Sequence, residues 1–368
     1  MAETLSIPLN DLSRGARFDD ELVAAVDRVA RSGWYLLGEE TKAFERELTE
    51  YLGVPYAVCV GNGTDALELA FAALGSQPGD DLVTAANAGG YATCAARRRG
   101  LRLRFADVED RDLLVSRRTI EAALTPRTTI VVVTHLYGKM APVEDVRDLC
   151  DVRGIALVED CAQAAGAHVG GRYAGSFGHA ATFSFYPTKN LGALGDAGAV
   201  VTPDERIARR LQRLRQYGWE AKYRLHEDGG RNSRMDEIQA AVLRVRLTRL
   251  DALNSRRRQI VADYAQALSS STVTMAQTGA SDYVAHLAVV RSPARDALAE
   301  GLRERGVHTD IHYPVPDHRQ PVTGVPMLKL PVTDAASAQI LTLPCFPELE
   351  ASEVEAVCRA LGEVVRSP

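Results

Sequence analysis

The stretch YAVCVGNGTDALELAF, residues 56–71, is typical of a buried strand that passes through a glycine-rich turn into a helix. Gly61, Gly63 and Thr64 stand at the turn, where backbone N–H groups and a hydroxyl gather at the positive end of the helix. A turn of this kind can bind an anion such as phosphate. A helix that is capped by Thr or Asp, with no ligand, explains the same letters equally well.

Short apolar runs alternate with helical segments along the first two thirds of the chain. The runs include TIVVVTH (129–135), IALVED (155–160) and GAVVT (198–202). This alternation predicts an α/β fold with a mostly parallel sheet that is covered by helices on both faces. After about residue 235, a long helical stretch from Asp236 to about Leu268 leads into mixed short segments. We therefore expect a large domain with an N-terminal arm over residues 1–240, then a connecting helix and a smaller α+β domain over residues 241–368.

The composition argues against several classes of protein. The 368 residues carry a formal net charge of -5, whereas nucleic-acid binding needs a basic surface. No apolar stretch approaches the ~18–20 residues of a membrane span, and the N-terminus lacks the pattern of a signal peptide. The six cysteines form no C-x-x-C pair or group with histidine. We expect a cytoplasmic protein with reduced thiols and no metal, membrane or nucleic-acid partner.

Ionisable residues stand at the exits of several predicted strands, where α/β proteins bind ligands. Glu159 and Asp160 end IALVED, and Lys189 follows an aromatic strand in AATFSFYPTKNLGALGDAGAVV (180–201). A buried carboxylate needs a partner or becomes neutral, and a desolvated lysine amine is suited to Schiff-base chemistry. Ordinary explanations are a helix cap for the acids and a lysine that extends to solvent. His135, at the end of TIVVVTH, is most simply a hydrogen-bonded core histidine.

Taken together, these features fit a ligand with a phosphate, a ring nitrogen that is protonated and an aldehyde. Pyridoxal 5′-phosphate has all three groups, and its usual partners are a lysine and an aspartate. The P-loop signature G-x-x-x-x-G-K-[ST] is missing around GNGTDA, and GRYAGSFGHA lacks the spacing of a serine hydrolase. The sequence therefore favours a pyridoxal-phosphate enzyme over these two classes.

Four segments carry a family resemblance: GNGTDALELA, VEDCAQAAGA, FSFYPTKNLGALGDAGAVVT and GGRNSRMDEIQAAVL. In this order they resemble the DegT/DnrJ-type sugar-nucleotide aminotransferases, which are fold-type I pyridoxal-phosphate enzymes with a mostly parallel seven-stranded sheet. The resemblance implies that Lys189 anchors the cofactor and that Asp160 contacts its ring nitrogen. It also implies roles for Gln163 at the ring hydroxyl, Tyr91 stacked on the ring, Gly63, Thr64 and Ser184 at the phosphate, and Asn232 at the phosphate of a neighbouring subunit. The role of Asn232 implies a homodimer with shared active sites.

Three further segments, NAGGYAT (87–93), QYGWEAKY (216–223) and HYPVPDHRQP (312–321), resemble one subgroup of this family. Its members make 3-amino-3,6-dideoxyhexoses from dTDP-3-keto-6-deoxyhexoses for glycosylated natural products such as antibiotics. Glutamate is the expected amino donor. Lys222, Tyr223, His312 and Tyr313 are our candidates for sugar contacts, although each could be a polar rim residue.

Other functions stay open at this point. One is an aminotransferase that acts on a 4-keto-sugar nucleotide or on a substrate of the scyllo-inosose type. Another is a non-catalytic sensor of the cofactor or of a sugar nucleotide. A related branch of dehydratases has histidine at the anchor position, so Lys189 argues against dehydration.

Overall fold

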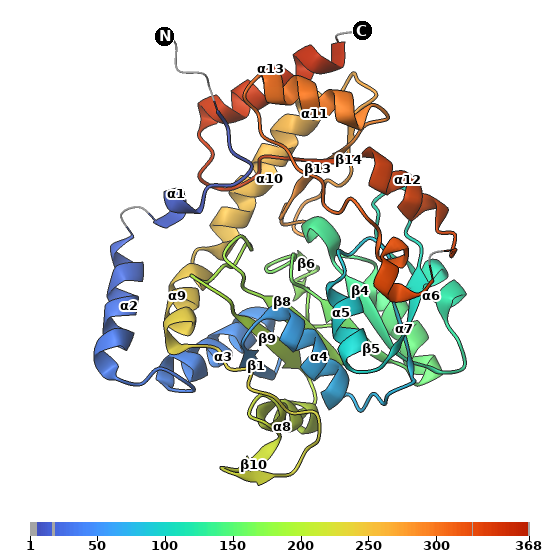
Figure 1. The fold of residues 1–368 in the computed structure, drawn as a ribbon. Coiled ribbons are helices and arrows are strands. Elements are labelled where there is room, and N and C mark those ends of the chain that lie inside the picture. Colours follow the sequence, from blue (N-terminus) through green and yellow to red (C-terminus); the bar gives the residue numbers. More distant parts are fainter. Residues whose placement is uncertain (1–5, 17–18, 326, 367–368) are drawn as a thin grey trace.

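The computed structural model describes residues 6–16, 19–325 and 327–366. The outermost residues of the two expected domains, 1–5 and 367–368, lie outside this range, and the first of these stretches is part of the N-terminal segment considered for a signal peptide. Figure 1 shows a central sheet with helices on both sides and a second body of helices and short strands, to which both ends of the chain run.

The central sheet has seven strands in the order β1-β9-β8-β5-β4-β2-β3. The pairs β2–β3, β2–β4, β4–β5 and β5–β8 are parallel, and β9 is antiparallel to both of its neighbours. The strands are β1 (Tyr56–Val60), β2 (Asp81–Ala85), β3 (Arg102–Ala106), β4 (Thr128–Thr134), β5 (Ala156–Asp160), β8 (Ala180–Ser184) and β9 (Gly198–Thr202). The α/β fold with a mostly parallel seven-stranded sheet is confirmed.

The helices of this body carry buried apolar residues, which pack against the sheet or against other helices. They are α2 (Asp20–Ser32), α3 (Glu39–Leu52), α4 (Gly63–Ala73), α5 (Tyr91–Arg98), α6 (Arg117–Ala123), α7 (Val143–Arg153), α8 (Glu205–Leu214) and α9 (Glu237–Leu247). Two hairpins and a short helical turn lie between them: β6 (His168–Val169) with β7 (Arg172–Tyr173), β10 (Trp219–Ala221) with β11 (Arg224–Leu225), and η1 (Leu136–Gly138). Helix α4 is capped by Asn62, whose Oδ1 accepts from the Asp65 N–H at 2.8 Å, and not by the Thr or Asp that the sequence suggested.

The remaining elements are α1 (Leu12–Ala16), α10 (Leu250–Ala267), β12 (Thr274–Met275), β13 (Ala288–Arg291), α11 (Arg295–Glu304), η2 (Asp317–Arg319), η3 (Pro321–Thr323), α12 (Pro331–Gln339), β14 (Ile340–Leu343) and α13 (Ala351–Arg366). Ala336 of α12 belongs to the main core, whereas α10, β13, α11, β14 and α13 form a second apolar core. The fully buried Ile7 joins this core and forms a bridge with Val307, so the N-terminal segment packs with the C-terminal part of the chain. The domain division at residue 240 stays a prediction.

The long helical stretch predicted from Asp236 to Leu268 is two helices. Helix α9 ends at Leu247 and α10 starts at Leu250; both leucines are buried in the main core, and between them Arg249 pairs with Asp19 at 2.6 Å. The apolar spacing alone does not reveal this break. No described helix is long and apolar enough to cross a membrane.

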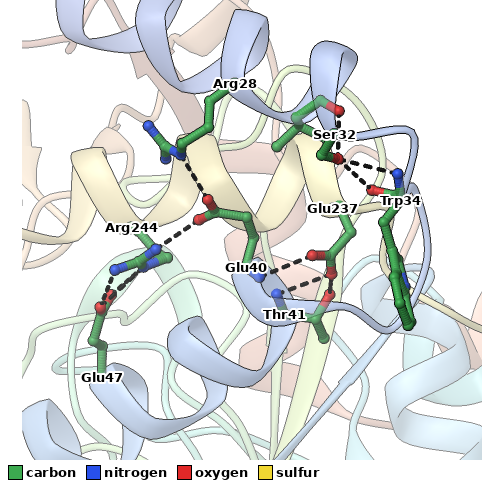
Figure 2. A network of polar contacts seen from close by, with 9 residues as sticks. Arg28, Ser32, Trp34, Glu40, Thr41, Glu47, Glu237 and Arg244 are labelled. Carbon is green, nitrogen blue, oxygen red and sulfur yellow. Dashed lines mark hydrogen bonds and ion pairs between the residues drawn. The ribbon is translucent and has the colours of Figure 1, made fainter.

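A buried carboxylate at the start of α9 organises the start of α3 (Figure 2). Glu237 is 3% exposed and accepts from the backbone N–H groups of Gly38 (2.9 Å), Glu40 (2.8 Å) and Thr41 (3.0 Å), and also from the Thr41 hydroxyl. Gly38, the residue before α3, offers no side chain as a cap. Glu237 therefore supplies the negative charge at this helix N-terminus from 196–199 residues away.

Replacing Glu237 by alanine is expected to lower the free energy of unfolding by about 3 kcal/mol, because three N–H groups at the helix start lose their acceptor. Chemical denaturation at a fixed protein concentration measures the change. The exposed Glu50 of α3 is the matched control, and Glu50→Ala should change the free energy by less than about 0.5 kcal/mol. A loss below about 1 kcal/mol for Glu237→Ala would contradict this account of the cluster.

Candidate active site

A cavity of about 630 Å³ opens beyond the carboxyl ends of β5 and β8 and beside the start of α4. Its lining comes from both cores: Asp160 and Ser184 end two sheet strands, while His312 and Tyr313 come from the C-terminal part. Parallel strands place their carboxyl ends at one edge of the sheet, which brings residues from distant parts of the sequence into this cavity.

Lys189 lies in the turn that follows β8 and lines the cavity. Its backbone N–H donates to the carbonyl of Tyr186 at 2.8 Å. A Cβ atom at Gly192 would lie 2.5 Å from the Pro187 carbonyl oxygen, so the tight turn requires glycine at that position. Burial lowers the pKa of Lys189 to about 8, although Asp160 acts to raise it. Near neutral pH, a much larger fraction of this amine than of an ordinary lysine is therefore neutral and nucleophilic.

Asp160 ends β5 and is 5% exposed. Burial raises the pKa of its carboxyl group, while the Ala162 N–H, Lys189, His135 and Thr134 act to lower it. One oxygen accepts from the Ala162 N–H at 3.1 Å, and the other is 3.4 Å from the Thr134 hydroxyl. The carboxylate is therefore oriented by its neighbours and also faces the cavity.

Glu159, the residue before Asp160, has a different environment. It accepts from the N–H groups of Gly175, Phe177 and Gly178 at 2.9, 2.8 and 2.6 Å, and its Oε2 lies 3.0 Å from Nε2 of His135. Because His135 Nδ1 accepts from the Ala141 N–H, Nε2 carries the proton and donates to Glu159. His135 is thus the hydrogen-bonded core histidine that the sequence allowed. With Cys161 these two residues form the one cluster of potential metal ligands among the described residues, and both His135 nitrogens are used inside the protein.

The turn between β1 and α4 provides the cradle for an anion. Gly63 starts α4, and a Cβ atom on it would lie 2.6 Å from the Cβ atom of Ser184, so only glycine allows this approach. Thr64 and Ser184 line the same part of the cavity. Two hydroxyls and a helix N-terminus together suit a phosphate group. With Lys189 and Asp160 in the same cavity, the donor set fits pyridoxal phosphate.

The other predicted site residues divide into two groups. Tyr91, His312 and Tyr313 line the cavity, and the rings of Tyr91 and Tyr313 meet edge to face at 6.2 Å. Gln163 does not line the cavity itself, but its Nε2 donates to the hydroxyl of Tyr313, which does, at 3.0 Å.

Lys222, Tyr223 and Asn232 do not line this cavity. Lys222 and Tyr223 are exposed at the turn of the β10–β11 hairpin, which projects from the molecule beside α8 (Figure 1). Asn232 is exposed and pairs with Gln216 in an isolated bridge. Within one chain the structure does not bring these three residues to the site.

His286 also lines the cavity, although no sequence signal singled it out. The Asn190 side chain donates to the Val284 carbonyl (2.9 Å) and to Asn254 Oδ1 (2.7 Å), which leaves its own oxygen to accept from His286 Nδ1 at 2.9 Å. Nδ1 therefore carries the proton, and Nε2 keeps its lone pair. Burial, then the nearby Lys189, Arg257 and His312, hold the pKa of His286 well below its usual value, so the ring is neutral. In the sequence, only the position of Asn190 directly after Lys189 connects His286 with the site, through the hydrogen bond between their side chains.

Comparisons with known proteins agree with this arrangement. The sequence profile of the DegT/DnrJ/EryC1/StrS aminotransferase family matches residues 17–362. The chain is 41% identical over 354 residues to a "dTDP-3-amino-3,4,6-trideoxy-alpha-D-glucose transaminase" of Micromonospora megalomicea subsp. nigra, covering 94% of this chain and 95% of that protein. It is 40% identical over 363 residues to the "Erythromycin biosynthesis sensory transduction protein EryC1" of Saccharopolyspora erythraea, covering 97% and 99%.

Among solved structures, S. venezuelae DesV in complex with a ketimine intermediate superposes with a TM-score of 0.95 at 40% sequence identity. The match covers 99% of this chain and 100% of the DesV chain. The similarity therefore extends over both cores and over the cavity between them.

Proposed function

The chain belongs to the DegT/DnrJ/EryC1/StrS family of pyridoxal-phosphate-dependent aminotransferases of fold type I, and from this premise we propose that it aminates C-3 of a dTDP-3-keto-6-deoxyhexose. The observation that carries the proposal is the cavity in which Lys189, Asp160 and an anion cradle come together. The choice of substrate is supported by the near full-length relative whose name specifies a dTDP-3-amino sugar. We propose glutamate as the amino donor and biosynthesis of a glycosylated natural product as the setting.

When bound, pyridoxal phosphate supplies an aldehyde that reacts with amines and a ring that delocalises the electrons of the adjacent carbon. Gly63, Thr64 and Ser184 would bind its phosphate, and Asp160 would hold a proton on its ring nitrogen. The amine of Lys189 can remove and return a proton at the substrate carbon, because its lowered pKa leaves it partly neutral at neutral pH. In the balanced reaction the amino group of the donor replaces the keto oxygen of the sugar, and glutamate leaves as 2-oxoglutarate.

We further propose that the enzyme works as a homodimer. Lys222, Tyr223 and Asn232 lie outside the cavity of their own chain, which suggests that they serve the cavity of a second protomer. The β10–β11 hairpin also carries exposed apolar side chains, among them Tyr223 (78% exposed) and Leu225 (71%). Large exposed apolar side chains that gather on one face favour association. The six free cysteines support the proposed cytoplasmic location.

A second candidate function is that of a non-catalytic sensor, because the name of the Saccharopolyspora relative describes a sensory transduction protein. The combination of a lysine with a pKa of about 8 and a buried aspartate in one cavity favours catalysis.

The proposal is tested with purified protein that has been loaded with pyridoxal phosphate and mixed with glutamate and one keto substrate at a time. The panel contains dTDP-3-keto-6-deoxyglucose, dTDP-3-keto-4,6-dideoxyglucose, dTDP-4-keto-6-deoxyglucose and scyllo-inosose. We expect amination of the 3-keto sugars, with at least about tenfold preference in kcat/KM over the 4-keto sugar. The two 3-keto sugars differ in the hydroxyl at C-4, so the ratio of their kcat/KM values shows whether the enzyme recognises that hydroxyl. Amination of the 4-keto sugar or the inosose alone would refute the proposed position, and bound cofactor without turnover would favour a sensor.

A further inference from the structure

We propose that Asp317 is a positioning residue whose carboxylate accepts a hydrogen bond from Thr93 in the first turn of helix α5 and thereby holds Tyr91 against Tyr313. The measurement of kcat and KM in the test below rests on the function proposed above, whereas the measurement of hydrogen exchange does not. The two tyrosines line the cavity from different parts of the chain, and their relative placement needs a fixed link between those parts.

Helix α5 has no cap of its own. The residue before it, Gly90, has a φ of 82° and no side chain to accept the first N–H groups of the helix. Asp317 instead bonds to a side chain of the first turn: the Thr93 hydroxyl donates to its Oδ2 at 2.6 Å, and the N–H groups of Gly89 and Gly90 lie close enough to its carboxylate to lower its pKa. The Asp317 N–H donates to the carbonyl of Ala86 at 2.7 Å. Asp317 thus links the first turn of α5, and Ala86 before it, to a segment that lies 224 residues further along the chain than Thr93.

The charge of Asp317 suits this position. The residue is 1% exposed, and burial raises the pKa of its carboxyl group to about 6, while Thr93, Gly90 and Gly89 act to lower it. At neutral pH the group is therefore mostly ionised and places a negative charge at the positive end of α5.

The glycines before α5 make close contact with the opposite segment possible. A Cβ atom on Gly89, which has a φ of 79°, would lie 2.7 Å from the ring of Tyr313. The Tyr313 ring therefore packs directly on this backbone, and its edge-to-face contact with Tyr91 follows. The two segments that the sequence analysis singled out separately, NAGGYAT and HYPVPDHRQP, form one contact.

Other bonds hold the near end of the second segment. The Tyr137 hydroxyl donates to the carbonyl of His312, and Gln163 donates to the Tyr313 hydroxyl. Neither bond reaches α5, whereas Asp317 bonds to it directly. Loss of Asp317 should therefore free the first turn of α5, with Tyr91, and leave Lys189 and Asp160 in place.

The test compares Asp317→Ala, Asp317→Asn and Thr93→Val with the wild-type protein, all loaded with pyridoxal phosphate. Hydrogen–deuterium exchange is followed over residues 88–98 and 312–320, and kcat and KM are measured for the keto sugar. In Asp317→Ala we expect faster exchange in both segments and a fall of about tenfold or more in kcat/KM, mainly through KM. The visible absorbance of the cofactor and its response to glutamate should stay within about twofold. Asp317→Asn should recover part of the loss, because its carbonyl oxygen still accepts from the Thr93 hydroxyl.

Asp148→Asn, an exposed position on α7, is the control and should leave every readout unchanged. Wild-type exchange over residues 88–98 in Asp317→Ala, or an equal increase throughout the protein, would overturn the proposal. If Asp317→Ala does not fold, Thr93→Val decides, since it removes one donor to the carboxylate and should speed exchange in the same two segments. If the wild-type protein aminates no keto sugar, the proposed function fails, while the exchange measurements still decide the role of Asp317.

Discussion

Replacement of Lys189 by alanine is expected to reduce transamination at least about 10⁴-fold, which is the upper end of what general acid–base catalysis alone contributes. The variant loses the amine that we propose both anchors the cofactor and moves a proton in the cavity. Visible absorption before and after addition of glutamate, together with single-turnover formation of the amino sugar, measures the two losses. Lys189→Arg should be nearly as inactive, because a guanidinium keeps its proton.

The matched control is Lys42→Ala, at an exposed lysine of α3 that pairs with Glu39. Its activity should equal that of the wild-type protein. If Lys189→Ala kept more than about 1% of the wild-type rate, Lys189 would be neither the anchor nor the proton carrier.

The pH dependence gives an independent view of the same amine. Because burial lowers the pKa of Lys189 from 10.5 to about 8, the rate at which the cofactor-free protein takes up pyridoxal phosphate should rise with pH and level off just above pH 8. The folded state releases this proton more readily than the unfolded state. Between about pH 8 and 10.5, the unfolded state therefore binds more protons, and the contribution of Lys189 to the free energy of unfolding rises with pH. That contribution to stability is lost as the pH falls through 8. If instead the rate of pyridoxal phosphate uptake kept rising until pH 10, the amine of Lys189 would not be buried as described.

Asp160→Asn is expected to lower the rate of transamination about 10³-fold while cofactor binding and stability persist. The asparagine keeps the shape of the side chain but loses the charge that would hold a proton on the ring nitrogen, and loss of one preorganised electrostatic partner costs about 10²–10³-fold. Burial already raises the pKa of Asp160, so the ionised group is held at a cost and its neutral replacement should not lower the melting temperature. Single-turnover kinetics and thermal unfolding measure the two effects.

The pKa of Lys189 should also fall below about 8 in Asp160→Asn, because the carboxylate acts to raise it. The uptake of pyridoxal phosphate would then level off at a lower pH than in the wild-type protein. Activity within tenfold of the wild type would rule out a role for this carboxylate at the ring.

Part of the site could be predicted because it depends on strand ends. Asp160, Ser184 and Lys189 lie at or just after the carboxyl ends of apolar runs, and the alternation of strands and helices places those ends at one edge. The family resemblance then supplied a role for each residue. Lys222, Tyr223 and Asn232 came from the same resemblance, but the fold of one chain keeps them away from the cavity. Their proposed role needs a second protomer.

The tertiary structure alone decided which side chains support the site. Asp317 bonds to the first turn of α5, and Glu237 caps α3, in each case from more than 190 residues away, so no local signal near either helix start could reveal them. The choice of the His286 nitrogen that carries the proton likewise depends on Asn190 and Asn254, which come from different elements.

The sequence by itself determined the alternation of elements, the mostly parallel sheet and the lysine and aspartate at its edge. These features follow from the periodicity of apolar residues and from local turn chemistry, which act over a few neighbouring residues. Helix caps, side-chain protonation states and the Tyr91–Tyr313 contact were decided by the tertiary structure. They depend on burial and on hydrogen bonds between distant segments, which exist only after the two cores have packed together.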